Sequence, residues 1–159
     1  GGATYSTLLN QYYPQLRRIE YTIAYIVRPF DIEELKEIIK SNPKLLSLNE
    51  MFLLAKTYEP TSKEFKQVFD VAMHIYPTSS IAIINSAAAD IEAENYNSAI
   101  EKLNRLKDNP KAWNNLGVAY ARLGDLEKAG FYFSKAAESK IQQAIANDEQ
   151  LKLFIENNK

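Results

Sequence analysis

The stretch from residue 110 to residue 139 restricts the possible fold more than any other part of the chain. Apolar residues recur there at steps of three and four, which is the spacing of one face of a helix. Between the two apolar sets, Gly124 is free to take a positive φ and Asp125 can cap the next helix. Small residues at Gly117 and Ala129 let two helices approach closely, with aromatic side chains filling the remaining space. The sequence therefore predicts a helical hairpin whose facing residues are Trp113, Leu116, Gly117, Tyr120, Ala129, Phe133 and Ala136.

Residues 31–159 as a whole follow this helical pattern. Three capping-box signals, in which a polar cap residue is followed three positions later by Glu, begin at Asp31, Ser47 and Thr61. Prolines follow the apolar stretches, and each proline prevents the preceding helix from continuing. We therefore expect short helices of about 10 to 15 residues joined by tight turns, which is the pattern of stacked helical hairpins.

Residues 18–28 follow a different pattern. From Ile19 to Val27, β-branched and aromatic residues alternate with others at a period of two, which favours a strand. The rival interpretation is a helix, because Ala24 and Ile26 blur the alternation. A lone strand needs a partner for its backbone edges, and three are open: residues 5–13, a second copy of the chain in a homodimer, or a domain upstream. We expect an N-terminal segment, 1–30, and a helical domain, 31–159.

Composition excludes several function classes. The 159 residues include 19 Lys+Arg and 20 Asp+Glu, a balance that gives no electrostatic footprint for nucleic acid. The chain has no cysteine, and His74 is its one histidine, interpreted as a helix-surface residue. No glycine motif suits a phosphate or a nucleophile elbow, and no apolar run is long enough to span a membrane. We predict no catalytic residue, no cofactor and no metal site, and hence a protein that is not an enzyme.

Residues 110–139 resemble a tetratricopeptide repeat, on the pattern of Trp113, Leu116, Gly117, Tyr120, Ala129, Phe133 and Ala136. A degenerate copy precedes it at a distance of 30 residues, and a fainter third copy extends the repeats over residues 47–139. Ile141 stands where the family pattern has proline. Residues 140–157 are expected to form a terminal helix that caps the stack. The predicted fold class is mainly α, a tetratricopeptide-like stack of antiparallel hairpins with a short N-terminal β-strand.

The resemblance implies a groove that binds a protein or peptide partner and is lined by the first helix of each repeat. The carboxylate clamp of some family members is not recognisable, so capture of a carboxylate tail is not predicted. The apolar groove positions of the middle copy are equally consistent with core residues. Lys111 and Arg122 are also consistent with a solvated helix face that binds nothing. Carried over from the family, the groove positions are Lys111, Asn114, Val118, Ala121 and Arg122, preceded in the middle copy by Ile81, Ile84, Ala88 and Ile91.

A second resemblance concerns residues 18–21, 27–30 and 46–51. They look like the C-terminal part of envelope proteins from Gram-negative gut anaerobes, in which an OmpA-like domain is followed by tetratricopeptide-type repeats. This resemblance implies a periplasmic or cell-envelope location, with the cytoplasm as the alternative.

Two main functions follow from these resemblances. The first is a non-catalytic protein-interaction module within a larger envelope protein. The alternative is a purely structural spacer of an OmpA-like outer-membrane protein, with no soluble ligand. An unrecognised hydrolase is a minor third hypothesis, which would require a deep pocket with several perturbed titratable groups.

Overall fold

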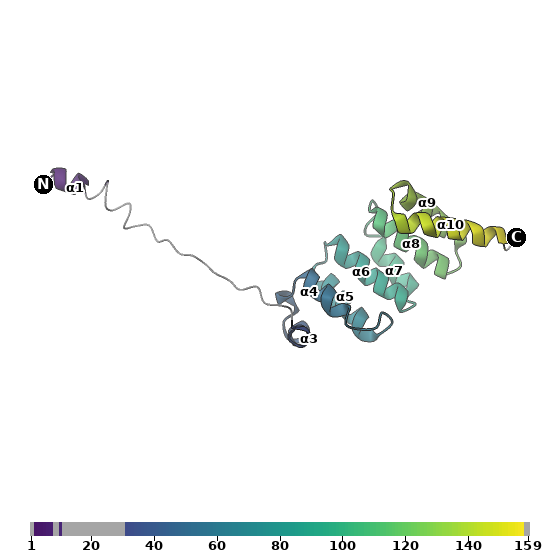
Figure 1. Cartoon of the computed structure of the whole chain (residues 1–159), viewed down its shortest axis with the longest axis horizontal. Coiled ribbons are helices and arrows are strands. Elements are labelled where there is room, and N and C mark those ends of the chain that lie inside the picture. Colours follow the sequence, from purple (N-terminus) through teal and green to yellow (C-terminus); the bar gives the residue numbers. More distant parts are fainter. Residues whose placement is uncertain (1, 8–9, 11–30, 158–159) are drawn as a thin grey trace.

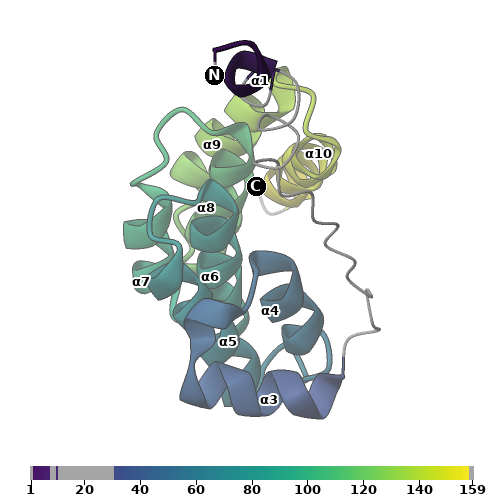
Figure 2. The same cartoon turned by 90° about the vertical axis from the view of Figure 1, so that its left-hand side faces the viewer.

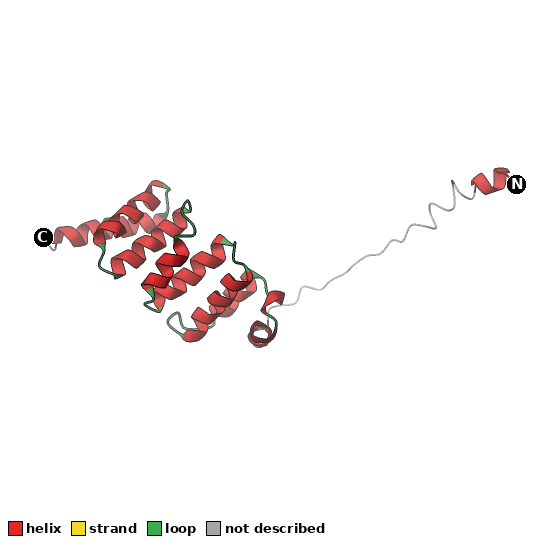
Figure 3. Ribbon diagram, turned by 180° about the vertical axis from the view of Figure 1, so that it is seen from behind, coloured by secondary structure: helices red, strands yellow, loops and turns green. Residues whose placement is uncertain are grey.

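The computed structural model describes residues 2–7, 10 and 31–157, and these residues form a series of short helices (Figure 1). The connections between successive helices from residue 31 onward are short, as the proline and capping signals predict. Figure 3 shows helices and loops in this part of the chain. The elements are α1 (Gly2–Thr7), α3 (Ile32–Ser41), the 3-10 helix η2 (Pro43–Leu45), α4 (Leu48–Ala55), α5 (Lys63–Ile75), α6 (Ser80–Glu92), α7 (Tyr96–Leu103), α8 (Pro110–Arg122), α9 (Leu126–Glu138) and α10 (Gln142–Asn157).

The predicted fold class was wrong in its strand, because every regular element of the described residues is helical. Residues 18–28 lie outside the described residues. Of the segment 5–13, which we considered as a pairing partner, residues 5–7 belong to α1. There the Ser6 hydroxyl donates to the carbonyl of Gly2, four residues back, which is a helical contact and not a strand contact. The described part of the chain is thus all-α, and the homodimer through a strand has no structural support.

Side-chain caps explain where the first helices begin. The carboxylate of Asp31 accepts from the backbone N–H of Glu33 at 2.9 Å. Ser47 and Glu50 form a full capping box, in which each side chain bonds the other residue's backbone N–H. At α5 the cap is Ser62 and not Thr61, because the Ser62 hydroxyl is the one that accepts from the N–H three residues on. Each cap satisfies a backbone donor that the first turn of a helix leaves free.

The helices pair into hairpins that stack from α4 to the C-terminal end of the described chain (Figures 1 and 2). The pairs are α4 with α5, α6 with α7, and α8 with α9, and each pair also packs on the next. Helix α3 packs beside α4, and α10 packs on α9. Along this stack the buried apolar residues gather in three clusters: the first lies mainly between α4 and α5, the second joins α6 and α7 to α8, and the third joins α9 to α10, so the core crosses from one repeat to the next.

The predicted hairpin between residues 110 and 139 is confirmed, and it is held by a close approach of its two helices. Ala129 and Ala136 are fully buried, and Leu116 is 2% exposed. The ring of Phe133 lies directly over Gly117, where a Cβ atom would come within 3.0 Å of Phe133 Cγ and closer to two other ring carbons. Only glycine leaves room for this ring.

The turn between α6 and α7, in the middle copy, has the same backbone geometry as the turn between α8 and α9, in the strong copy. Glu94 and Gly124 are 30 residues apart, and both have a left-handed backbone, with φ of 60° and 83°. The residue after each donates its N–H to a carbonyl five residues back, Asn95 to Asp90 at 2.7 Å and Asp125 to Tyr120 at 3.0 Å. Helix α7 has 8 residues and α9 has 13, so the middle copy is shorter in its second helix.

We predict that Gly117→Ala lowers the free energy of unfolding by about 1 to 3 kcal/mol, because the new methyl group overpacks against Phe133. The matched control is Gly130→Ala on the partner helix, where a Cβ atom meets Leu151 Cδ2 at an ordinary 3.5 Å. That control should be neutral or stabilising by up to about 1 kcal/mol, because alanine is the better helix former. Urea unfolding followed by circular dichroism measures both, and equal stabilities of Gly117→Ala and the parent would contradict the close approach.

We predict that Glu94→Gly stabilises the chain by about 1 kcal/mol, because the left-handed backbone at this position costs a non-glycine residue that amount. The reverse change at the equivalent turn, Gly124→Ala, should destabilise the chain by a similar amount. Thermal melts of the two variants should move in opposite directions. Shifts of the same sign would mean that the two turns are not equivalent.

Candidate functional site

Helix α10 runs beside α8 (Figure 2). The side chains of the two helices leave two open hollows along the seam between them. The first, of about 370 Å³, is called the Lys111 hollow and lies toward the start of α8. The second, of about 380 Å³, is called the Arg122 hollow and lies toward the end of α8. The Lys111 hollow is lined by Ile84, Lys111, Asn114, Asn115, Ile141 and Gln143, and the Arg122 hollow by Val118, Ala121, Arg122, Phe133, Asn147, Gln150, Leu151 and Phe154.

The structure brings most of the predicted groove residues to these two hollows. Ile84, Lys111 and Asn114 line the first hollow, and Val118 and Arg122 line the second. Ala121, also carried over from the family, lies beside Val118. These positions place the residues on one seam, and their role in binding stays a prediction.

The other positions in the middle copy do not reach the hollows. Ala88 is half-buried and lines neither of them. Ile91 packs against the second core cluster, as does the inner side of Ile84. Ile81 is 62% exposed. The apolar stripe of α6 therefore divides between core and surface, and the groove and core interpretations each hold for part of it.

An amide pair bridges the seam and separates the two hollows. The side-chain N–H of Asn147 on α10 donates to Asn114 Oδ1 on α8 at 3.0 Å. Asn114 also donates weakly to Asn115 Oδ1, at 3.4 Å. The predicted groove residue Asn114 thus joins two helices, and its amide oxygen is already engaged. The free hydrogen-bonding capacity of the seam comes from the exposed amides of Gln143 and Gln150.

The sequence analysis missed the contribution of α10, which it treated only as a cap. Helix α9 ends although no proline follows, because Lys140 takes a left-handed φ of 61° and Ile141 donates its N–H to the Ala136 carbonyl. The chain then turns back, so that α10 packs on α9 and lies beside α8. A signal was present in the sequence: Gln143, Asn147 and Gln150 are spaced by four and three, which puts three amides on one helix face.

The charge of the seam has one sign. Lys111 and Arg122 are the charged residues that line the two hollows, and both are exposed. Among the described residues neither side chain has an ion-pair partner, whereas Lys128 pairs with Asp125 and Lys152 with Asp148, both at 2.6 Å. The seam therefore offers two unneutralised cations, one at each end.

A second ionic feature lies away from the seam, where α5, α6 and α7 meet. Asp90 on α6 is fully buried, and its Oδ2 accepts from Lys102 Nζ and from the Ser98 hydroxyl, both at 2.6 Å. Its Oδ1 faces Lys66 Nζ on α5 at 2.9 Å. A buried carboxylate is tolerated only when it is paired in this way. Asp90 therefore holds three helices of two successive repeats together.

The network extends to a second carboxylate on α5. Asp70 accepts from Lys102 Nζ at 3.0 Å and from the Ser86 hydroxyl at 2.8 Å, and it also pairs with Lys66. Burial alone would raise the pKa of Asp70, but hydrogen bonds from Lys66, Lys102 and Ser86 outweigh it and lower the pKa. The pKa of Asp90 is lowered in the same way, with Lys102, Ser98 and Lys66 outweighing burial. Two lysines neutralise two aspartates, so the network is structural and offers no free charge to a ligand.

The one histidine of the sequence lies away from both hollows of the seam. His74 is exposed in the last turn of α5, beside a hollow of about 550 Å³ whose apolar residues include Pro43, Val71 and Ile75. Within the described ranges, no group of three or more His, Asp or Glu side chains is arranged to hold a metal ion. The described helices also include none with the length and apolar character that crossing a membrane requires.

Comparison with known proteins supports the repeat. The family model of the tetratricopeptide repeat matches residues 110–139, which are α8, α9 and the turn between them. No curated protein matches the chain. The OmpA-associated envelope resemblance gains no support from these comparisons. The matched repeat indicates a protein–protein interaction module, a class that is generally non-catalytic, and the chain is thus similar to tetratricopeptide repeats over α8 and α9.

We predict that the network makes stability fall in acid. The lowered pKa values of Asp70 and Asp90 mean that their contribution is present above about pH 4, the unfolded value, and is lost as pH falls through the folded values. Asp90→Asn should lower the free energy of unfolding at pH 7 by about 3 to 5 kcal/mol, because two largely buried lysine charges then share the single carboxylate of Asp70. The free energy of unfolding of this variant should also fall less steeply than that of the parent between pH 5 and pH 2.

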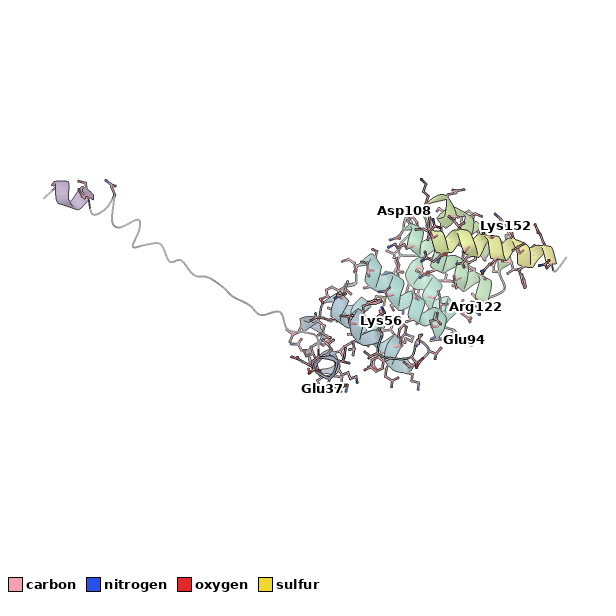
Figure 4. The ribbon with its side chains drawn as sticks, in the orientation of Figure 1. Glu37, Lys56, Glu94, Asp108, Arg122 and Lys152 are labelled. Atoms are coloured by element: carbon pink, nitrogen blue, oxygen red, sulfur yellow. The ribbon has the colours of Figure 1, made fainter. Side chains whose placement is uncertain are left out.

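The control for this measurement is Asp108→Asn, an exposed aspartate labelled in Figure 4. It removes the same charge outside the network and should change neither the stability at pH 7 nor the acid dependence. Urea unfolding at several pH values measures both quantities. If Asp90→Asn behaves like Asp108→Asn, the network does not join the repeats.

Proposed function

We propose that the chain is a non-catalytic module that binds a protein partner through an extended segment laid along the seam between α8 and α10. The observation that carries this proposal is the pair of hollows on either side of the Asn114–Asn147 bridge. Side chains of a bound segment would enter the two hollows, and its backbone would cross the amide bridge between them. This is the general arrangement by which grooves read extended peptides.

The lining chemistry suits such a ligand. Ile84 and Ile141 supply apolar surface in the first hollow, and Val118 and Leu151 in the second. Burial of an apolar side chain in each hollow supplies the affinity, at roughly 25 cal/mol per Å² of apolar surface removed from water. The amides beside them can donate to and accept from a peptide backbone, which fixes its position.

The cellular setting of this module is a separate part of the proposal. A place within a larger envelope protein, in the periplasm or at the outer membrane, rests on the resemblance of residues 18–21, 27–30 and 46–51 alone. The binding proposal does not depend on that setting.

The test blocks the hollows from outside without touching the core. Gln143→Trp and Gln150→Trp replace exposed lining residues with a bulky ring, one in each hollow. Peptides are first selected from a random displayed library on the parent chain. We expect each selected peptide to lose at least about tenfold in affinity for one or both variants, since a filled hollow excludes a side-chain anchor. The matched control is Glu149→Trp, an exposed neighbour on α10 that lines neither hollow, and it should bind as the parent does.

Two outcomes would contradict the proposal. Selection could return no peptide above background, which would leave the repeats with a spacing role. Alternatively, the selected peptides could bind both blocked variants and the control equally, which would move the binding surface elsewhere.

A further inference from the structure

We propose that the seam selects an acidic partner: an extended internal segment whose two carboxylates lie four or six residues apart on the side that faces the seam, with apolar side chains between them. This inference rests on the proposed function and adds the chemistry of the ligand to it. The structural basis is the pair of unneutralised cations, Lys111 and Arg122, at the outer ends of the two hollows.

The charge of the seam is unusual for this chain, whose net charge is -1. No carboxylate lines either hollow, although Asp and Glu together number 20 in the sequence. On the neighbouring helices α9 and α10, Lys128 and Lys152 are neutralised by aspartates, and Lys135 lies 4.0 Å from the ring centre of Trp113. The two cations of the seam lack such partners in the described chain, so they are available to an anionic ligand.

Glu94, an acidic residue labelled in Figure 4, does not alter this pattern. Figure 4 shows Glu94 and Arg122 at the same edge of the molecule. Glu94 belongs to the turn between α6 and α7, and it lines a different hollow with Asn95, Tyr96 and Leu123. Arg122 and Glu94 form no ion pair among the described residues. We therefore expect Glu94 to weaken the field at Arg122 without neutralising it, and Lys111 to contribute at least as much as Arg122.

The spacing of the carboxylates follows from helix geometry. Lys111 and Arg122 are 11 residues apart on α8, which corresponds to about 16 Å at a rise of about 1.5 Å per residue. An extended peptide advances about 3.3 Å per residue and points successive side chains to opposite faces, so two carboxylates that face the seam lie four or six residues apart, about 13 or 20 Å, which brackets this distance. Shorter acidic pairs reach one cation only. For the same reason a single terminal carboxylate cannot engage both, and the ligand is an internal segment.

The apolar part of the ligand follows from the hollows themselves. Their linings centre near Asn114 and near Ala121 along α8, so their entrances are about 10 Å apart by the same helical rise. Two apolar side chains on the same face of an extended segment lie two or four residues apart, about 7 or 13 Å, which brackets that distance. The ligand is thus an acidic–apolar–apolar–acidic segment, and the Asn114–Asn147 bridge lies under its middle.

The test uses two peptides with acetylated and amidated ends. The first is Glu-Ser-Leu-Ser-Leu-Ser-Glu, in which both Glu and both Leu share one face of the extended peptide, and the second replaces both Glu by Gln. Binding to the full chain is measured by amide chemical shifts in nuclear magnetic resonance titrations, at low salt and at high salt. We expect the Glu peptide to bind about threefold to twentyfold more tightly than the Gln peptide at low salt, because two exposed ion pairs contribute. High salt should remove that advantage by screening.

Charge reversal locates the effect. In the double variant Lys111→Glu with Arg122→Glu, we expect the Gln peptide to bind at least as well as the Glu peptide. The matched control is Lys44→Glu with Lys63→Glu, which makes the same change of net charge at exposed positions away from the seam and should keep the parent's preference. Circular dichroism of both double variants confirms that each is folded before the titrations are compared.

Three results would overturn the inference: equal binding of the two peptides by the parent at low salt, a preference for Glu that survives reversal at Lys111 and Arg122, or no saturable shift with either peptide. The proposed function is tested separately from this inference. If displayed peptides without acidic residues are selected and are blocked by Gln150→Trp, the seam binds peptides and only the acidic chemistry is wrong. If the Trp substitutions change the affinity of no peptide, both proposals are wrong.

Discussion

The contact between Gly117 and the ring of Phe133 is the constraint on which the C-terminal half of the structure depends. Because glycine has no side chain, Phe133 can lie across α8 and remain 4% exposed. The same ring lines the Arg122 hollow, on the side where α10 passes. Leu151 of α10 then packs in the cluster that contains Phe133. One small residue therefore sets the distance between α8 and α9, and with it the place of the third helix that completes the seam.

The middle repeat keeps this geometry with different chemistry. In the strong repeat, Tyr120 and Tyr132 stack with their ring centres 5.6 Å apart and 3° between their planes. The positions 30 residues earlier hold Asp90 and Lys102, which form a buried ion pair at 2.6 Å. The tyrosine stack is complete within its own hairpin, whereas a buried carboxylate needs several partners. One partner of Asp90 is Lys66 of the preceding repeat. Charge thus joins the first two repeats, whereas α9 and α10 are joined by apolar packing around Leu151 and by a hydrogen bond from the Ser134 hydroxyl to Asp148 Oδ1 at 2.9 Å.

Local sequence patterns account for the helices, the hairpins and most of the seam's α8 side. The steps of three and four, the caps at Asp31 and Ser47, and the small residues at Gly117 and Ala129 all act over a few residues, so a single sequence displays them. The predicted strand at 18–28 rested on alternation alone, and the described chain is helical. The ionic network escaped prediction because Lys102 and Asp70 are 32 residues apart, and nothing local marks them as partners.

The role of α10 shows why a capping helix can also be part of a binding surface. The last repeat of a stack exposes an apolar face, and a further helix must cover it. Covering that face with α10 buries Leu151 but also puts the amides of Asn147 and Gln150 opposite α8. The seam therefore depends on the residues of α10: a helix of different sequence in this position would bring other side chains opposite α8. The cations on α8 and the amides on α10 come together along this seam, so a ligand that contacts both is specific to it.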